Sequence, residues 1–81
     1  MALSDLAKKL ADYRARLDAG QADRIAPAHV DRVIRKLEAK RAKLVDELAT
    51  ATAETERERL ERKRAKAAAL IEQAHWLRDQ L

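Results

Sequence analysis

Side chains that could perform chemistry are scarce in this sequence. It holds two histidines, His29 and His75, one serine, Ser4, and no cysteine. Neither histidine belongs to a helical metal-binding pair, because His29 and Asp31 are two residues apart and a helix turns them to different faces. The single glycine leaves no glycine-rich phosphate loop, and the lack of thiols excludes cysteine nucleophiles and thiolate zinc sites. We therefore expect neither a metal nor a cofactor.

Carboxylates are numerous, but many have a cationic side chain three or four residues away. Glu38 has Arg35 and Arg41 at this spacing, and Glu61 has Arg57 and Arg64. Such pairs are solvated salt bridges on helix faces, each worth tenths of a kcal/mol. A catalytic carboxylate instead needs a cleft that raises its pKa. We therefore expect no enzymatic activity and no small-molecule substrate.

Two clusters of basic residues are the strongest candidates for a specific site. They could neutralise phosphates on a nucleic acid. The competing interpretation is a solubilising face, because five acids interleave with the cations, the net charge is only +4, and no aromatic residue lies near to stack on a base. The possible phosphate-binding residues are Lys40, Arg41, Lys43, Arg62, Lys63, Arg64 and Lys66.

The composition predicts that helices position these residues. Charged residues make up 40% of the 81 positions and aromatic residues 2%, and the chain has one glycine and one proline. Most positions are strong helix formers, which favours long helices or a coiled coil. Interleaved charges and periodic leucines argue against disorder. We expect a single all-α domain over residues 1–81.

Apolar periodicity and breakers divide the chain into three helices. A helix over residues 4–19 begins with Ser4 or Asp5 as its cap and ends at Gly20, which suits a left-handed conformation. A connector follows over residues 20–26, and Pro27 fits the first turn of the next helix. The remaining predicted elements are a helix over 27–51, a turn over 52–55 and a helix over 56–81.

Residues 27–81 allow two architectures, one continuous helix of about 80 Å or an antiparallel hairpin. In a hairpin centred on Glu54, facing residue numbers add to about 108 and the two leucine stripes meet, as in Leu48 with Leu60. A continuous helix rotates the stripe by about 120° between these two leucines, so one partner could not bury both halves. The turn lacks glycine, asparagine and proline, which counts against the hairpin. We favour the coiled-coil-like hairpin, which merges the two basic clusters into one patch.

The first helix is expected to pack at the open end of this hairpin. Val33 and Trp76 lie off the main stripes, and the hairpin would place them side by side as a second apolar face. The stripe of the first helix could dock there, or it could pair with a second copy of the chain. The residues expected to bind a partner are Leu6, Leu10, Tyr13, Leu17, Val33 and Trp76.

These features predict a non-catalytic protein that binds another protein or itself through amphipathic helix faces. It would act as an adaptor, an assembly factor or a small inhibitor, and we expect a homo-oligomer. The alternative is a nucleic-acid- or ribosome-associated protein whose basic arm contacts phosphates. The first five residues lack the pattern of a secretory signal, and no apolar run is long enough to cross a bilayer. We expect a cytoplasmic protein without membrane contact.

Overall fold

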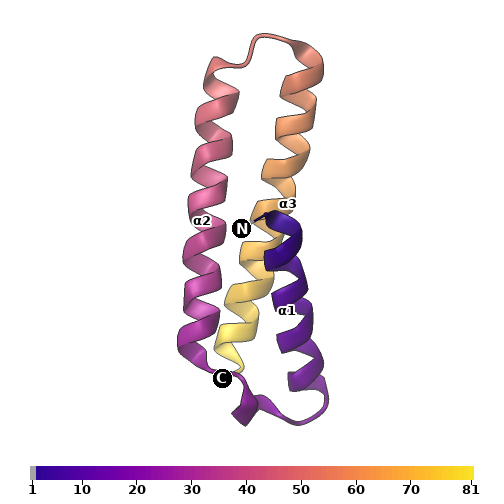
Figure 1. The fold of residues 1–81 in the computed structure, drawn as a ribbon, viewed down its shortest axis with the longest axis vertical. Coiled ribbons are helices and arrows are strands. Elements are labelled where there is room, and N and C mark those ends of the chain that lie inside the picture. The colour runs from indigo at the N-terminus through magenta and orange to yellow at the C-terminus, as the bar shows by residue number, and fades with distance from the viewer. Residues whose placement is uncertain (1) are drawn as a thin grey trace.

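The protein is a three-helix structure built on a long hairpin. A computed structural model describes residues 2–81 and shows α2 and α3 running antiparallel, with α1 beside the half of the hairpin away from the turn (Figure 1). The molecule measures 47 × 19 × 18 Å. The expected all-α hairpin with a shorter N-terminal helix is confirmed. The helices are α1 (Leu3–Asp18), η1 (Ala22–Arg24, a 3₁₀ turn), α2 (Pro27–Thr50) and α3 (Glu54–Asp79).

The helix ends lie within two residues of the predicted ones. The chain reverses over residues 51–53, so α3 begins at Glu54 and not at residue 56. Glu54 and Glu56 both lie in the first turn of α3, where a negative charge is favoured by the helix dipole. At the start of α1, Ala2 is the capping residue and Ser4 lies inside the helix. Asp5 does serve the cap, because its carboxylate accepts the Ala2 N–H at 3.2 Å.

The hairpin turn needs no glycine because its backbone stays extended. Ala51 ends α2 at φ −71° and ψ 129°, and Ala53 precedes α3 at φ −75° and ψ 128°. The carbonyls left free at the end of α2 need donors. Arg57 supplies them from the first turn of α3, since its Nη1 donates to the carbonyl oxygens of Leu48 and Ala51, both at 3.1 Å. The absence of a turn-forming residue is therefore compensated by one arginine.

The connector between α1 and α2 follows the predicted breakers. Gly20 has a φ of +74°, the left-handed region where glycine is favoured. Its N–H donates to the Leu17 carbonyl at 3.0 Å, and the Gln21 N–H donates to that of Arg16 at 2.8 Å. These two bonds form a Schellman motif that closes α1. Pro27 is the first residue of α2, as expected.

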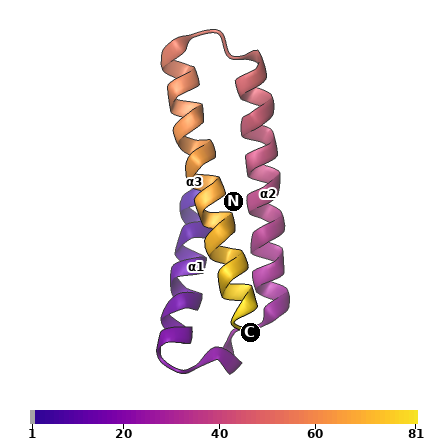
Figure 2. The same cartoon turned by 180° about the vertical axis from the view of Figure 1, so that it is seen from behind.

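The core has two parts that meet where α1 begins. In the open half of the hairpin (residues 27–37 and 70–79), α1 adds Leu6 and Leu10 to apolar residues of α2 and α3. Ile25 of the connector is also buried there, at 3% exposure, although no core residue was expected in that segment. In the turn half (residues 44–50 and 54–67), only α2 and α3 form the core. Leu3 packs against both clusters, so α1 starts at mid-height (Figure 2).

An ion pair between the two long helices agrees with the predicted register. The Nε of Arg78 in α3 lies 2.9 Å from Oδ1 of Asp31 in α2. These residue numbers add to 109, close to the value of about 108 expected from the leucine stripes. Leu48 and Leu60, predicted to face each other, belong to one core cluster. Within residues 2–81, no helix combines the length and apolar character required to cross a membrane.

Candidate interaction surfaces

The six residues predicted to bind a partner fall into three environments. Leu6, Leu10 and Val33 are at most 5% exposed and belong to the core, so the folded chain already covers them. Tyr13 and Leu17 are half-buried against the same core. Trp76 is 43% exposed. The stripe of α1 thus docks onto its own hairpin, and Trp76 is the member with the largest reachable surface.

Val33 and Trp76, expected to lie side by side, line different grooves on the two sides of α1. Val33 lines a groove between α1 and α2, together with Tyr13 and His29. Trp76 lines a different groove, between α1 and α3. The reason is that α1 inserts Leu6 and Leu10 over the seam of the hairpin, which leaves the two residues on opposite flanks of α1.

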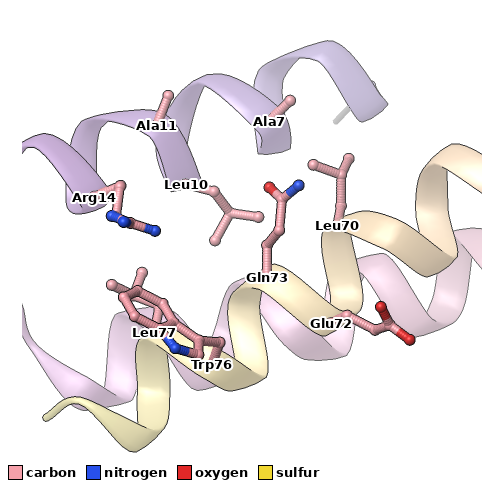
Figure 3. Close-up of a pocket in the computed structure, with 9 residues that line it drawn as sticks. All are labelled: Ala7, Leu10, Ala11, Arg14, Leu70, Glu72, Gln73, Trp76 and Leu77. Atoms are coloured by element: carbon pink, nitrogen blue, oxygen red, sulfur yellow. The ribbon is translucent and has the colours of Figure 1, made fainter.

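The groove on the Trp76 side, here called the α1–α3 groove, is the larger of the two. It is open to solvent, has a volume of about 680 Å³ and lies between two parallel helices (Figures 1 and 3). Small and apolar side chains form much of its lining, and Leu10 closes its floor toward the core. It is lined by Ala7, Leu10, Ala11 and Arg14 of α1 and by Leu70, Glu72, Gln73, Trp76 and Leu77 of α3.

A cation–π contact holds the exposed tryptophan at one end of this groove. The guanidinium carbon of Arg14 lies 4.4 Å from the centre of the Trp76 ring (Figure 3). Arg14 is itself oriented by Asp18, one turn further along α1, with Nε at 3.0 Å from Oδ1. At a partly exposed site, a cation–π contact contributes about 0.5–1 kcal/mol. The contact with Arg14 therefore holds the indole ring in place as one side of the groove.

Sequence reasoning missed the α1 side of this groove. Ala7, Ala11 and Arg14 were not predicted to bind a partner, because alanine is a common helix former and Arg14 was expected to be a solvated charge. The available signal was the spacing of Ala7 and Ala11, four residues apart and one residue from Leu6 and Leu10 on the helix. That spacing indicates a row of small side chains on the helix beside the buried stripe.

The seven predicted phosphate-binding residues lie around the middle of the hairpin. Lys40 and Arg41 are half-buried beside the seam, and the other five are exposed. Arg64 forms an ion pair with Glu61 at 2.6 Å. A shallow groove of about 280 Å³ runs along α2 past Lys40 and Lys43. The structure thus places the cations of both helices on the same part of the rod.

The residues considered for catalysis remain separate. His29 and His75 are both exposed, on α2 and α3. Residues 2–81 contain no group of three or more His, Cys, Asp or Glu side chains that could hold a metal ion. The carboxylates of the ion pairs within this part of the chain are solvent-exposed to at least 42%.

Comparison with known proteins assigns the chain to no family. No protein-family description, curated protein or solved structure matches the chain.

Proposed function

We propose that this protein is a non-catalytic binding protein that receives one helix of a partner protein in the α1–α3 groove. The partner is a separate protein or a second copy of this chain. The observation that supports this most directly is the exposure of Trp76, at 43%, beside an apolar groove. Tryptophan is enriched among the residues that dominate binding energy in interfaces.

The shape of the groove favours a helix as the occupant. α1 and α3 run parallel, and a third helix laid between them would complete a small bundle with the hairpin. Helix axes pack 8–10 Å apart, and the distance depends on the side chains at the contact. Ala7 and Ala11 leave room for the close end of that range. The partner helix would place large apolar residues against these alanines and against Trp76.

Charges at the rim of the groove would select orientation. Arg14 lies near the Trp76 end, and Glu72 lies at the side of α3, directed away from α1 in Figure 3. Rim charges contribute more to specificity and association rate than to affinity. A partner helix with an acid near Arg14 and a base near Glu72 would fit best. Such a contact suits an adaptor, an assembly factor or a small inhibitor.

Site-specific photocrosslinking tests this proposal. A photoreactive amino acid is placed at Ala11, inside the groove, and in a matched variant at Val45, which is 48% exposed on the turn half of α2. Both variants are expressed in the native host, irradiated and analysed by mass spectrometry. We expect one defined adduct from Ala11 and none of that species from Val45. In the Ala11 variant, Trp76→Ala should reduce the adduct strongly, because loss of an interface tryptophan costs about 2 kcal/mol, or about 30-fold in affinity.

The identity of the adduct separates the two kinds of partner. An adduct with twice the mass of the chain identifies a second copy, and an adduct with a different polypeptide identifies a separate partner. Equal labelling at Ala11 and Val45, or no adduct at Ala11, would contradict docking in the groove.

A further inference from the structure

A stretch of the hairpin at mid-height carries cations and no acids. Residues 39–45 of α2 and 62–71 of α3 contain seven lysines and arginines and not one aspartate or glutamate. Since the whole chain has a net charge of +4, the remaining residues together carry −3. The positive charge of this protein is therefore concentrated in one band of the rod.

The register places these two segments at the same level. Asp31 and Arg78 are in contact, at 2.9 Å, and both helices rise by about 1.5 Å per residue in opposite directions. Twelve residues beyond Asp31 is Lys43, and twelve residues before Arg78 is Lys66. The two lysines therefore lie at equal height, about 18 Å from the ion pair.

Helical periodicity places four of the seven cations on one face. Lys40 and Lys43 lie seven residues after Val33 and Lys36, which line the groove between α1 and α2. Two turns of a helix return a residue to nearly the same direction, about 10.5 Å further along. The two lysines therefore continue the face that α1 covers in the open half of the hairpin.

The same reasoning applies to α3. Lys63 and Lys66 lie seven residues before Leu70 and Gln73, which line the α1–α3 groove. Lys40, Lys43, Lys63 and Lys66, here called the lysine face, thus flank the hairpin seam just beyond the start of α1. Arg64 instead turns toward Glu61 and pairs with it.

Ion pairs within residues 2–81 do not neutralise the lysine face, although Asp46 and Glu47 lie three and four residues from Lys43. Within residues 2–81, none of its four lysines takes part in an ion pair. Three of them are exposed, and Lys40 is half-buried. α1 begins next to the face, on the side of the open half, since Leu3 packs against both core clusters. The positive end of the α1 dipole lies on this side as well, where the carboxylate of Asp5 in the first turn offsets it.

We propose that the lysine face binds the phosphate backbone of a nucleic-acid double helix without preference for base sequence. Lysines from two antiparallel helices form two rows that can contact phosphates of one duplex surface. The two aromatic residues of the chain, Tyr13 and Trp76, lie in the open half of the molecule, so no ring is available at the face to stack on unpaired bases. Double-stranded rather than single-stranded nucleic acid is therefore the expected ligand.

A lipid surface fits the lysine face less well. Helices that lie on membranes insert large apolar side chains beside their cations. The exposed large apolar residues of the described chain are Val45, Trp76 and Leu81. Val45 is two residues from Lys43, which turns it to the other side of α2. Among the described residues, no large apolar side chain therefore accompanies the lysines toward a bilayer.

Fluorescence anisotropy with a labelled DNA duplex of mixed sequence, about 20 base pairs long, tests the proposal. Each neutralised phosphate contributes about 0.9 to the slope of log affinity against log salt, so four contacts predict a slope of about −3.6. Affinity should fall about 150-fold between about 50 mM and about 200 mM salt. A second duplex of different sequence should bind equally.

Two variants of equal net charge separate the face from the overall charge. In one, Lys40, Lys43, Lys63 and Lys66 are changed to Gln. In the control, Lys8, Arg24, Arg32 and Arg35 are changed to Gln, all of which are exposed and lie outside the face. Circular dichroism first establishes that both are folded. We expect the lysine-face variant to lose about 100-fold in affinity and most of the salt slope, and the control to stay within about fivefold of the unmodified protein.

Several outcomes would overturn the proposal. They are equal losses in the two variants, no binding of the duplex at about 50 mM salt, tighter binding of a single strand than of the duplex, and displacement of the duplex by an equal charge concentration of polyglutamate. The last result would identify an acidic protein segment as the occupant. None of these outcomes bears on the groove proposal, because crosslinking at Ala11 reports a different surface.

Discussion

Arg57 stabilises a helix–helix turn that contains no glycine, asparagine or proline. Its guanidinium bonds to two carbonyls, those of Leu48 and Ala51, at the end of α2. Hydrogen bonds from a charged donor are stronger than neutral ones, although solvent competes at an exposed turn. Arg57 therefore links the two long helices at the point where their core is smallest.

Replacing Arg57 by alanine should weaken the hairpin. We expect the Arg57→Ala variant to lose about 1 kcal/mol of unfolding free energy, because two helix-terminal carbonyls lose their donor. The measurement is urea unfolding followed by far-ultraviolet circular dichroism. Arg59→Ala is the matched control, since the ion pair of Arg59 with Glu56 is long, at 4.0 Å, and exposed. It should lose less than about 0.5 kcal/mol. Equal losses in the two variants would contradict the role given to Arg57.

Residues with a local conformational requirement were predictable from the sequence. Gly20 and Pro27 occupy the positions expected of them, because a left-handed φ and a missing N–H constrain the chain wherever it goes. Arg57 and the stacking of Arg14 on Trp76 were not predictable, since each joins groups on different helices. Their geometry exists only once the helices have been placed relative to each other.

At the scale of elements, α1 is the least firmly held of the three helices. It has 16 residues, against 24 for α2 and 26 for α3, and its side chains in the core are Leu6 and Leu10. A helix of this length is marginal in water unless it is packed. Local openings of low free energy are expected in such elements. Both proposed surfaces depend on α1, because it forms one wall of the groove and begins beside the lysine face.

Charging the buried side of α1 should release it from the hairpin. Leu10 is 5% exposed, so Leu10→Asp would bury an unpaired carboxylate unless the helix detaches. We expect the amides of α1 to lose their protection in hydrogen exchange, and far-ultraviolet ellipticity to fall by about a quarter, the share of α1 among the helical residues.

The neighbouring residue supplies the control for this experiment. Ala11→Asp introduces the same charge on the exposed groove side of α1 and should leave the protection of the helix intact. In the unmodified protein, α1 amides should exchange faster than those buried in α2 and α3. A Leu10→Asp variant with fully protected α1 amides would show that α1 is not held by this face.

At the scale of the whole molecule, the leucine stripes predicted the hairpin and its register. They succeeded because burial requires apolar residues from two antiparallel arms to coincide, and few registers satisfy Leu48 with Leu60 and the other pairs together. The side of the hairpin that α1 covers was not predictable in the same way. Val33 and Trp76 both looked like docking positions, and only the path of the connector, with Ile25 buried, places α1 between them.

Both proposed surfaces depend on the reversal of the chain at residues 51–53, which pulsed electron paramagnetic resonance tests directly. The protein has no cysteine, so Arg35→Cys and His75→Cys together introduce two unique sites for spin labels on exposed positions of α2 and α3. Paired helix axes lie 8–10 Å apart, so the labels should be within about 25 Å of each other. A distance of about 60 Å, the length of forty residues in one continuous helix, would contradict the hairpin and both surfaces built on it.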